Sequence, residues 1–147
     1  MSDFFNFFKS DPQQNQIEDD VNPVAMAAAV LLIEMARADF QQEDIENTAI
    51  VELLMEYFSL NAEDAGNLFQ AAEKVADHSV SLHDFTRTLH ETLNPDAKNE
   101  IIEMLWRLAL VDDSLDRYED YLVRKIADLL YVSNSNVLRI KHDLLSK

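Results

Sequence analysis

The chain lacks cysteine and has little glycine or proline: its 147 residues include no Cys, one Gly and three Pro. Without cysteine, disulfides, thiolate zinc sites, iron–sulfur clusters and cysteine nucleophiles are all excluded. Glycine and proline are also the residues that most strongly disfavour helix interiors. Their scarcity, together with apolar residues that recur with the 3.6-residue period of a helix, predicts helices joined by short loops.

Basic residues are scarce too. Twelve Lys and Arg stand against 28 Asp and Glu, so the formal net charge is −16. Nucleic acid and anionic membrane surfaces would be repelled by this excess of negative charge. We therefore expect no nucleic-acid partner, and we expect cations or a protein with a basic surface instead.

Long apolar runs are missing as well. The longest, Val24 to Ile33, is too short to span a bilayer. The N-terminus has no basic segment leading into an apolar one, as a secretory signal would. We therefore expect a cytoplasmic protein without a transmembrane segment.

The length is that of one domain, and the apolar content of 48% is enough for a sizeable core. Residues 1–21 differ from the rest and form a Phe-rich and acidic tail. This tail is an anchor for a partner or membrane, an end whose aromatic residues fold back on the domain, or a mobile end. Residues 22–147 are the expected helical domain. Helical periodicity predicts seven helices, at residues 23–38, 42–58, 62–77, 82–93, 95–111, 116–131 and 134–146.

Candidate N-cap residues precede most of these helices: Asn22, Asn61, Ser81, Asn94 and Ser133. Asn22 and Asn94 are each followed by Pro, which is favoured at the first helical position. Asn61 and Ser81 each have an Asp three residues later, which resembles a capping box. The first and fifth helices are apolar on nearly every side, so both should lie in the middle of a bundle, with the third and fourth bridging the repeats described next.

One helix-loop-helix pattern occurs twice, at a constant offset of 73 residues. The first copy runs from Leu31 to Phe58 and the second from Met104 to Tyr131. Apolar residues coincide along both helices of the pair. The sequence therefore predicts an all-α, compact bundle of about seven helices, built from two helix-loop-helix repeats around two buried helices.

Acidic residues coincide in the two copies as well: Asp39 with Asp112, Glu43 with Asp116, and Glu46 with Glu119. Hard divalent cations such as Ca²⁺ and Mg²⁺ take oxygen ligands, mostly carboxylates and carbonyls. A loop Asp and a Glu seven residues later could converge on one ion. The same acids also suit the N-terminus of a helix, where they interact with the exposed N–H groups and the helix dipole. Both interpretations stand at this point.

Other known site types fit poorly. If Asp112 began an EF-hand loop, position six would be Arg117 instead of Gly, and position twelve would be Val123 instead of Glu. His83 and His90 share a helix face but lie about 10 Å apart along it, so we interpret the histidines as surface residues. Trp106 lies on an apolar helix and is interpreted as core.

The two acidic turns and the buried helices before them resemble the TerB-like family, named for bacterial tellurite-resistance proteins. The resemblance is carried by Ala36-Arg37-Ala38-Asp39 with Glu46, and by Leu110-Val111-Asp112-Asp113 with Glu119. It extends from about Pro23 to Lys147. The family's turn is usually Asp-Gly, whereas Phe40 and Asp113 stand at the Gly positions here.

The resemblance implies an all-α domain whose two acidic loops bind a divalent cation, in a stress-response setting and in some cases beside the inner face of the membrane. Carried over to this sequence, the metal ligands would be Asp39, Glu46, Asp112, Asp113 and Glu119, with Glu43 and Asp116 as second choices. Our first hypothesis is a non-enzymatic module that binds a divalent cation, with Ca²⁺ favoured, and a protein partner. The alternative is a metal-free acidic protein-interaction module.

Overall fold

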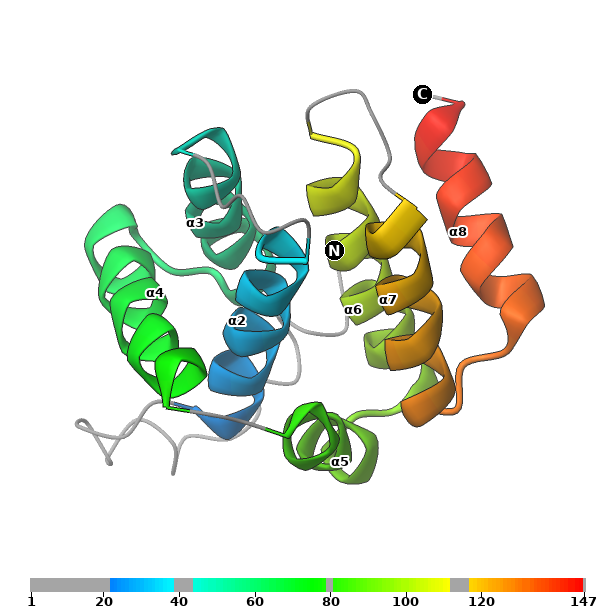
Figure 1. The fold of residues 1–147 in the computed structure, drawn as a ribbon, viewed down its shortest axis with the longest axis horizontal. Helices are drawn as coiled ribbons and strands as arrows, with labels where there is room; N and C mark the ends of the chain where they lie inside the picture. Colours follow the sequence, from blue (N-terminus) through cyan, green and yellow to red (C-terminus); the bar gives the residue numbers. More distant parts are fainter. Residues whose placement is uncertain (1–21, 39–43, 79–80, 112–116, 147) are drawn as a thin grey trace.

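The computed structural model describes residues 22–38, 44–78, 81–111 and 117–146. Within these ranges the chain is entirely helical apart from its connections (Figure 1). Seven helices are described: α2 (Pro23–Ala36), α3 (Asp44–Phe58), α4 (Ala62–Asp77), α5 (Leu82–Thr92), α6 (Pro95–Ala109), α7 (Arg117–Leu129) and α8 (Asn134–Leu145). The all-α bundle is therefore confirmed, and the predicted helix ends agree to within about two residues.

Helix α2 forms the centre of the bundle. Nearly all of its side chains are buried, and it packs against α3, α4, α5, α6 and α7. Helix α6 is the second buried helix and packs against α2, α3, α7 and α8. Along Ile101–Ala109 its side chains are buried except at Glu103 and Arg107, which are one turn apart. The prediction of two central helices is thus confirmed.

The predicted bridging role holds for only one of the two helices that connect the repeats. Helix α5 packs against both α2 and α7, and so contacts both repeats. Helix α4 packs chiefly against α2 and α3, which belong to the first repeat (Figure 1). The apolar side chains of α4 are buried at Ala65, Leu68 and Ala72, and the helix packs chiefly within the first repeat. The prediction that α4 bridges the two repeats was therefore wrong.

Four of the five predicted N-caps are present. The side chains of Asn22, Asn61, Asn94 and Ser133 each accept a hydrogen bond from a backbone N–H in the first turn of the following helix. Ser81 makes no such side-chain bond, and its carbonyl accepts from the Asp84 N–H instead. The capping box expected at Ser81 was therefore wrong, because the backbone of this turn already occupies the N–H.

The internal repeat is confirmed in the core. At the 73-residue offset, Ile50 and Val123 are both buried, as are Leu53 and Ile126, and Tyr57 and Leu130. Ile45 and Tyr118 also correspond, but both are largely exposed on the first turns of α3 and α7. An apolar residue at this position of the repeat therefore does not belong to the hydrophobic core.

The two copies diverge where α3 and α7 end. A residue with positive φ follows each helix, Ser59 with φ 56° and Tyr131 with φ 64°. The residue after each of these donates a backbone hydrogen bond back into the helix. Leu60 N–H donates to Met55 O in the first copy, and Val132 N–H donates to Ala127 O in the second. This left-handed helix end comes one residue earlier in the second copy. As a result Phe58 is buried, whereas its counterpart Tyr131 is 78% exposed.

No helix in the described ranges is both long enough and apolar enough to cross a membrane. The Phe-rich segment of residues 1–21, and the expectations attached to it, lie outside the described residues.

Candidate functional site

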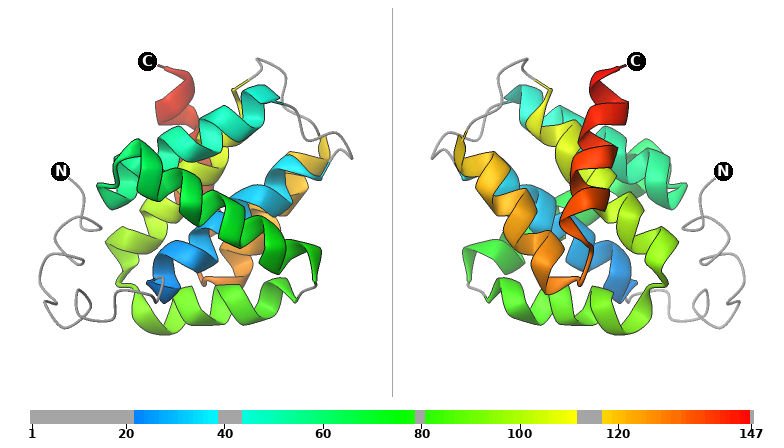
Figure 2. Two further views of the ribbon diagram at one scale, coloured as in Figure 1. Left: turned by 90° about the vertical axis from the view of Figure 1, so that its left-hand side faces the viewer. Right: turned by 90° about the vertical axis from the view of Figure 1, so that its right-hand side faces the viewer.

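Two of the predicted ligands, Glu46 and Glu119, occupy equivalent places in the two repeats. Glu46 lies on the first turn of α3 and Glu119 on the first turn of α7. Their exposed fractions are 4% and 3%, and they are the only buried charged side chains among the described residues. The C-terminal ends of α2 and α6 and the beginnings of α3 and α7 lie on one side of the molecule (Figure 2). The repeat therefore places one buried carboxylate in each copy on that side.

The burial of these carboxylates requires compensation. Moving a charged carboxylate out of water is costly unless it is hydrogen-bonded, paired or coordinated to a metal. A first-turn position supplies part of this compensation, because the free N–H groups and the positive end of the helix dipole favour negative charge. A bound divalent cation would supply more. Carboxylates such as these are among the ligands that hard cations accept, and they also suit the capping role.

The remaining predicted ligands, Asp39, Asp112 and Asp113, lie outside the described residues, as do the second choices Glu43 and Asp116. Within the described part of the chain, no three Asp, Glu or His side chains come together in a group that could hold a metal ion. The structure thus locates one predicted ligand from each repeat, Glu46 and Glu119.

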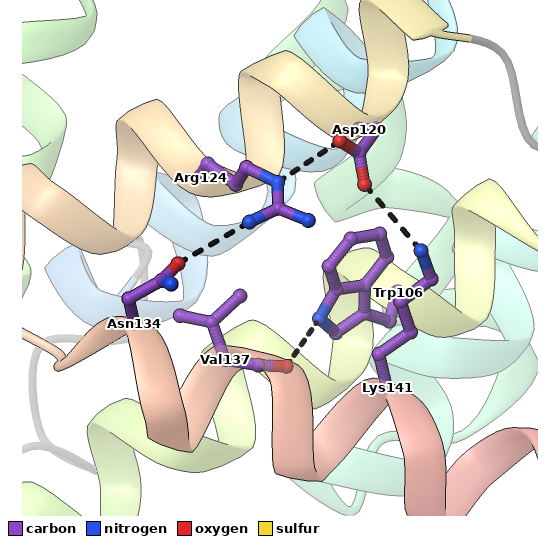
Figure 3. Close-up of polar contacts among 6 residues, drawn as sticks. All are labelled: Trp106, Asp120, Arg124, Asn134, Val137 and Lys141. Atoms are coloured by element: carbon purple, nitrogen blue, oxygen red, sulfur yellow. Dashed lines mark hydrogen bonds and ion pairs between the residues drawn. The ribbon is translucent and has the colours of Figure 1, made fainter.

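Asp120, which follows Glu119, is occupied by cationic partners. Its carboxylate accepts a hydrogen bond from Arg124 Nε at 2.9 Å and lies 3.6 Å from Lys141 Nζ on α8 (Figure 3). Arg124 also donates to the side-chain oxygen of Asn134 at 3.2 Å. Because Asp120 is neutralised by two basic residues, it serves the contact between α7 and α8 and is a poor candidate for a cation ligand.

Trp106 lies beneath this ion-pair cluster. It is fully buried, and its indole N–H donates to the Val137 carbonyl of α8 at 3.1 Å (Figure 3). Lys141 Nζ lies 5.0 Å from the ring centroid, within the range of a cation–π contact. The interpretation of Trp106 as core is confirmed. Its polar edge, which helical periodicity does not reveal, attaches α8 to the second repeat.

A second polar cluster joins α3 to α6 and was not anticipated from the sequence. The hydroxyl of Tyr57 donates to Glu103, and Arg107 donates to Tyr57 and to Glu56, both at 3.0 Å. Burial, followed by the bond to Glu103, raises the pKa of Tyr57 above its ordinary range. The bond to Glu56 raises the pKa of Arg107 further, so it stays a cation. The only available signal was the pair Glu103 and Arg107, four residues apart on an otherwise buried face.

An acidic cleft of about 230 Å³ opens between α6 and α8. Its lining is mostly charged: Asp96, Asn99, Glu100, Glu103, Arg139, Ile140, Asp143 and Leu144. Arg139 pairs with Asp143 at 3.6 Å, which leaves an excess of carboxylates in the cleft. None of these residues was predicted as a site, because they come together only when α8 packs on α6.

The histidines follow the surface interpretation with one exception. His78, His83 and His142 are exposed. His90 is half-buried, stacks on Tyr131 and lies against Lys98. His83 and His90 do not form a shared site.

These features define a class of protein: an all-α domain in which a duplicated helix pair places a buried Glu on the first turn of its second helix. The family model described as "Tellurite resistance protein TerB" matches residues 25–142, which is more than half of the chain. The chain therefore belongs to the TerB family, as the acidic turns indicated. Neither the curated proteins nor the solved structures gave a significant match.

Proposed function

We propose that this TerB-family domain is a non-enzymatic module that binds a divalent cation, with Ca²⁺ favoured, and that engages a protein partner. The observation that supports the cation is the duplicated, buried carboxylate of Glu46 and Glu119. Caps alone do not need burial, since a capping carboxylate functions at the surface. Two buried acids at equivalent places in a chain of net charge −16 are an arrangement that a bound cation would stabilise.

The acids that precede these helices in sequence would complete the ligand set. Asp39 comes before α3, and Asp112 and Asp113 come before α7. Oxygen donors of this kind suit Ca²⁺, which accepts six to eight ligands in flexible geometry. A bound cation would reduce repulsion among the carboxylates and stabilise the folded state by ligand linkage. We also propose a bacterial stress or tellurite-resistance setting, and the family description, which names tellurite resistance, supports it.

The test is thermal unfolding of the chelator-treated full chain, titrated separately with Ca²⁺, Mg²⁺, Mn²⁺ and Zn²⁺ at near-physiological salt. We expect a saturable increase in Tm with one ion. At a concentration 100 times the Kd, one site adds about 2.7 kcal/mol to the free energy of unfolding. Glu46→Gln and Glu119→Gln should abolish the increase, because each removes a charged ligand without changing the size of the side chain.

Matched controls separate a site from general charge screening. Glu52→Gln on α3 and Asp128→Asn on α7 change the net charge by the same amount at exposed positions of the same helices. Both should retain the full response to the cation. Equal small increases in Tm with every ion, or an unchanged response in Glu46→Gln and Glu119→Gln, would remove the cation from the proposal.

The second candidate is a metal-free acidic interaction module, and the cleft between α6 and α8 favours it. Its carboxylates are suited to a Lys or Arg side chain of a basic partner. A fluorescent oligolysine peptide, with chelator present, is the probe. We expect binding that weakens as salt increases and that is reduced in Asp96→Asn/Asp143→Asn. Glu63→Gln/Asp64→Asn on α4 removes equal charge elsewhere, so an equal loss of binding there would show that the cleft has no specific role.

A further inference from the structure

Lys98 has an unusual partner. It lies on the first turn of α6, and its Nζ is 2.7 Å from Nδ1 of His90 on α5. A lysine ammonium group has only donors, so in its charged form Lys98 donates to Nδ1 of His90, which acts as the acceptor. Among the described residues, Lys98 makes no ion pair with a carboxylate. The amine is therefore next to a base, whereas Lys141 is next to the acid Asp120.

The imidazole ring of His90 also contacts Tyr131. Its ring stacks on Tyr131 with 4.5 Å between centroids and 19° between planes. Tyr131 has a positive φ, so the backbone turn after α7 presents its ring to α5. Residues from three parts of the chain thus orient Nδ1 toward Lys98.

The partial burial of Lys98 favours the neutral amine. Lys98 is half-buried, and this desolvation lowers its pKa below the ordinary value. Lys74 and Lys125 are exposed to solvent on α4 and α7. The lowered pKa increases the fraction of Lys98 that is the nucleophilic free base at neutral pH.

We propose that Lys98 is an acylation site, at which an activated acyl donor of the acyl phosphate class transfers its acyl group to Nζ while His90 accepts a proton. His90 takes one proton from the ammonium, and the free amine attacks the carbonyl carbon. The C–O bond to phosphate breaks, and hydrogen phosphate leaves with one of the three ammonium protons. The proton that His90 accepted passes to solvent, and the third ammonium proton remains on the amide nitrogen.

The modification would change the side-chain contact that joins α5 to α6. The amide is uncharged and is a weak base, so the ammonium donor to His90 is lost. The net charge would become one unit more negative, and the contact between His90 and Lys98 would be replaced. This inference is independent of the cation proposed above, because none of its residues belongs to that ligand set.

The experiment treats the full chain with limiting acetyl phosphate at pH 7 and measures initial acetylation rates at each lysine by peptide mass spectrometry. We expect Lys98 to react several-fold faster than Lys74, although Lys74 is more exposed. His90→Phe keeps a flat ring against Tyr131 and removes the nitrogen base. It should reduce the rate at Lys98 to that of Lys74 or below, with the rate at Lys74 unchanged.

A slower reaction at Lys98 than at Lys74 in the unmodified chain would overturn the proposal, as would an unchanged Lys98 rate in folded His90→Phe. If that variant does not fold, the pH profile of the unmodified chain decides. The rate at Lys98 should level off at a lower pH than the rate at Lys74. Coincident profiles would show that Lys98 is an ordinary lysine.

Discussion

The first repeat, α2 with α3, and the second, α6 with α7, share a core but differ at their outer surfaces. Both bury apolar residues at equivalent positions, and both bury a Glu on the first turn of the second helix. Only the second repeat has the Asp120–Arg124–Lys141 cluster, because Asn47 and Val51 stand at the corresponding positions of the first. The shared features are those that hold a helix pair together. The differences lie where each pair meets the rest of the bundle.

Ile33 and Trp106 occupy equivalent core positions in the two repeats, and both are fully buried. Substitutions at these two positions should reduce stability the most. Trp106→Ala should lower the free energy of unfolding by about 3–5 kcal/mol, because it leaves a large cavity. It also removes the contacts with Val137 and Lys141. Ile33→Ala should cost less, about 2–4 kcal/mol, because fewer buried atoms are lost.

Urea unfolding of the two variants measures the difference, with Trp106→Phe as the control. Phe keeps most of the ring but cannot donate to Val137, so it should cost distinctly less than Ala. Equal losses from Trp106→Ala and Ile33→Ala would mean that the attachment of α8 adds little to the second repeat.

Tyr57 corresponds to Leu130, so its hydroxyl is specific to the first repeat. Tyr57→Phe should lower the free energy of unfolding by about 1–2 kcal/mol, because Glu103 and Arg107 lose a shared partner. The raised pKa of Tyr57 adds a pH dependence. The folded state retains the phenol proton, whereas the unfolded chain loses it near pH 10, so this contribution is complete below about pH 10 and decreases above it.

Unfolding free energies at several pH values from 8 to 11 test this expectation. The native chain should lose stability above pH 10 more steeply than Tyr57→Phe. Tyr118→Phe, at an exposed tyrosine, should behave like the native chain. Parallel curves for native and Tyr57→Phe proteins would contradict the assigned bond.

A smaller effect is expected for Asp120, whose ion pairs occur only in the second repeat. Asp120→Asn should cost about 0.5–1 kcal/mol, since its partners are partly exposed and screened by solvent. Asp143→Asn, in the more exposed pair with Arg139, should cost less. The difference measured by urea unfolding should shrink at 1 M NaCl, and a difference that increases with salt would exclude an electrostatic origin.

The smallest effect concerns the positive-φ residues that end α3 and α7. Ser59→Gly should stabilise the fold by up to about 1 kcal/mol, because Gly adopts this conformation without strain. Tyr131→Gly gains the same relief but loses the stack on His90, so its net effect should be near zero. Urea unfolding compares the two. A larger gain at Tyr131 would mean that its ring contributes nothing to stability.

The position of the acidic pair illustrates how far sequence reasoning reaches. The constant offset identified Glu46 and Glu119 as equivalent, and the structure buries both. The offset failed at Tyr131, because the positive-φ residue after α7 comes one residue earlier in the repeat than the one after α3. The end of a helix depends on which carbonyl accepts the hydrogen bond from the next backbone N–H. The periodicity of apolar residues does not predict which carbonyl that is.

The amino-acid sequence was sufficient to predict the helices, most of their caps, the two buried central helices and the correspondence between Glu46 and Glu119. All of these follow from local propensity and from periodicities within one or two helices. The polar contacts between helices could not be predicted and became known from the packed fold: Tyr57 with Glu103, Asp120 with Lys141, and His90 with Lys98. The two sets differ because the spacing of residues along one helix is a property of the chain. The distance between side chains on different helices depends on how the whole core packs.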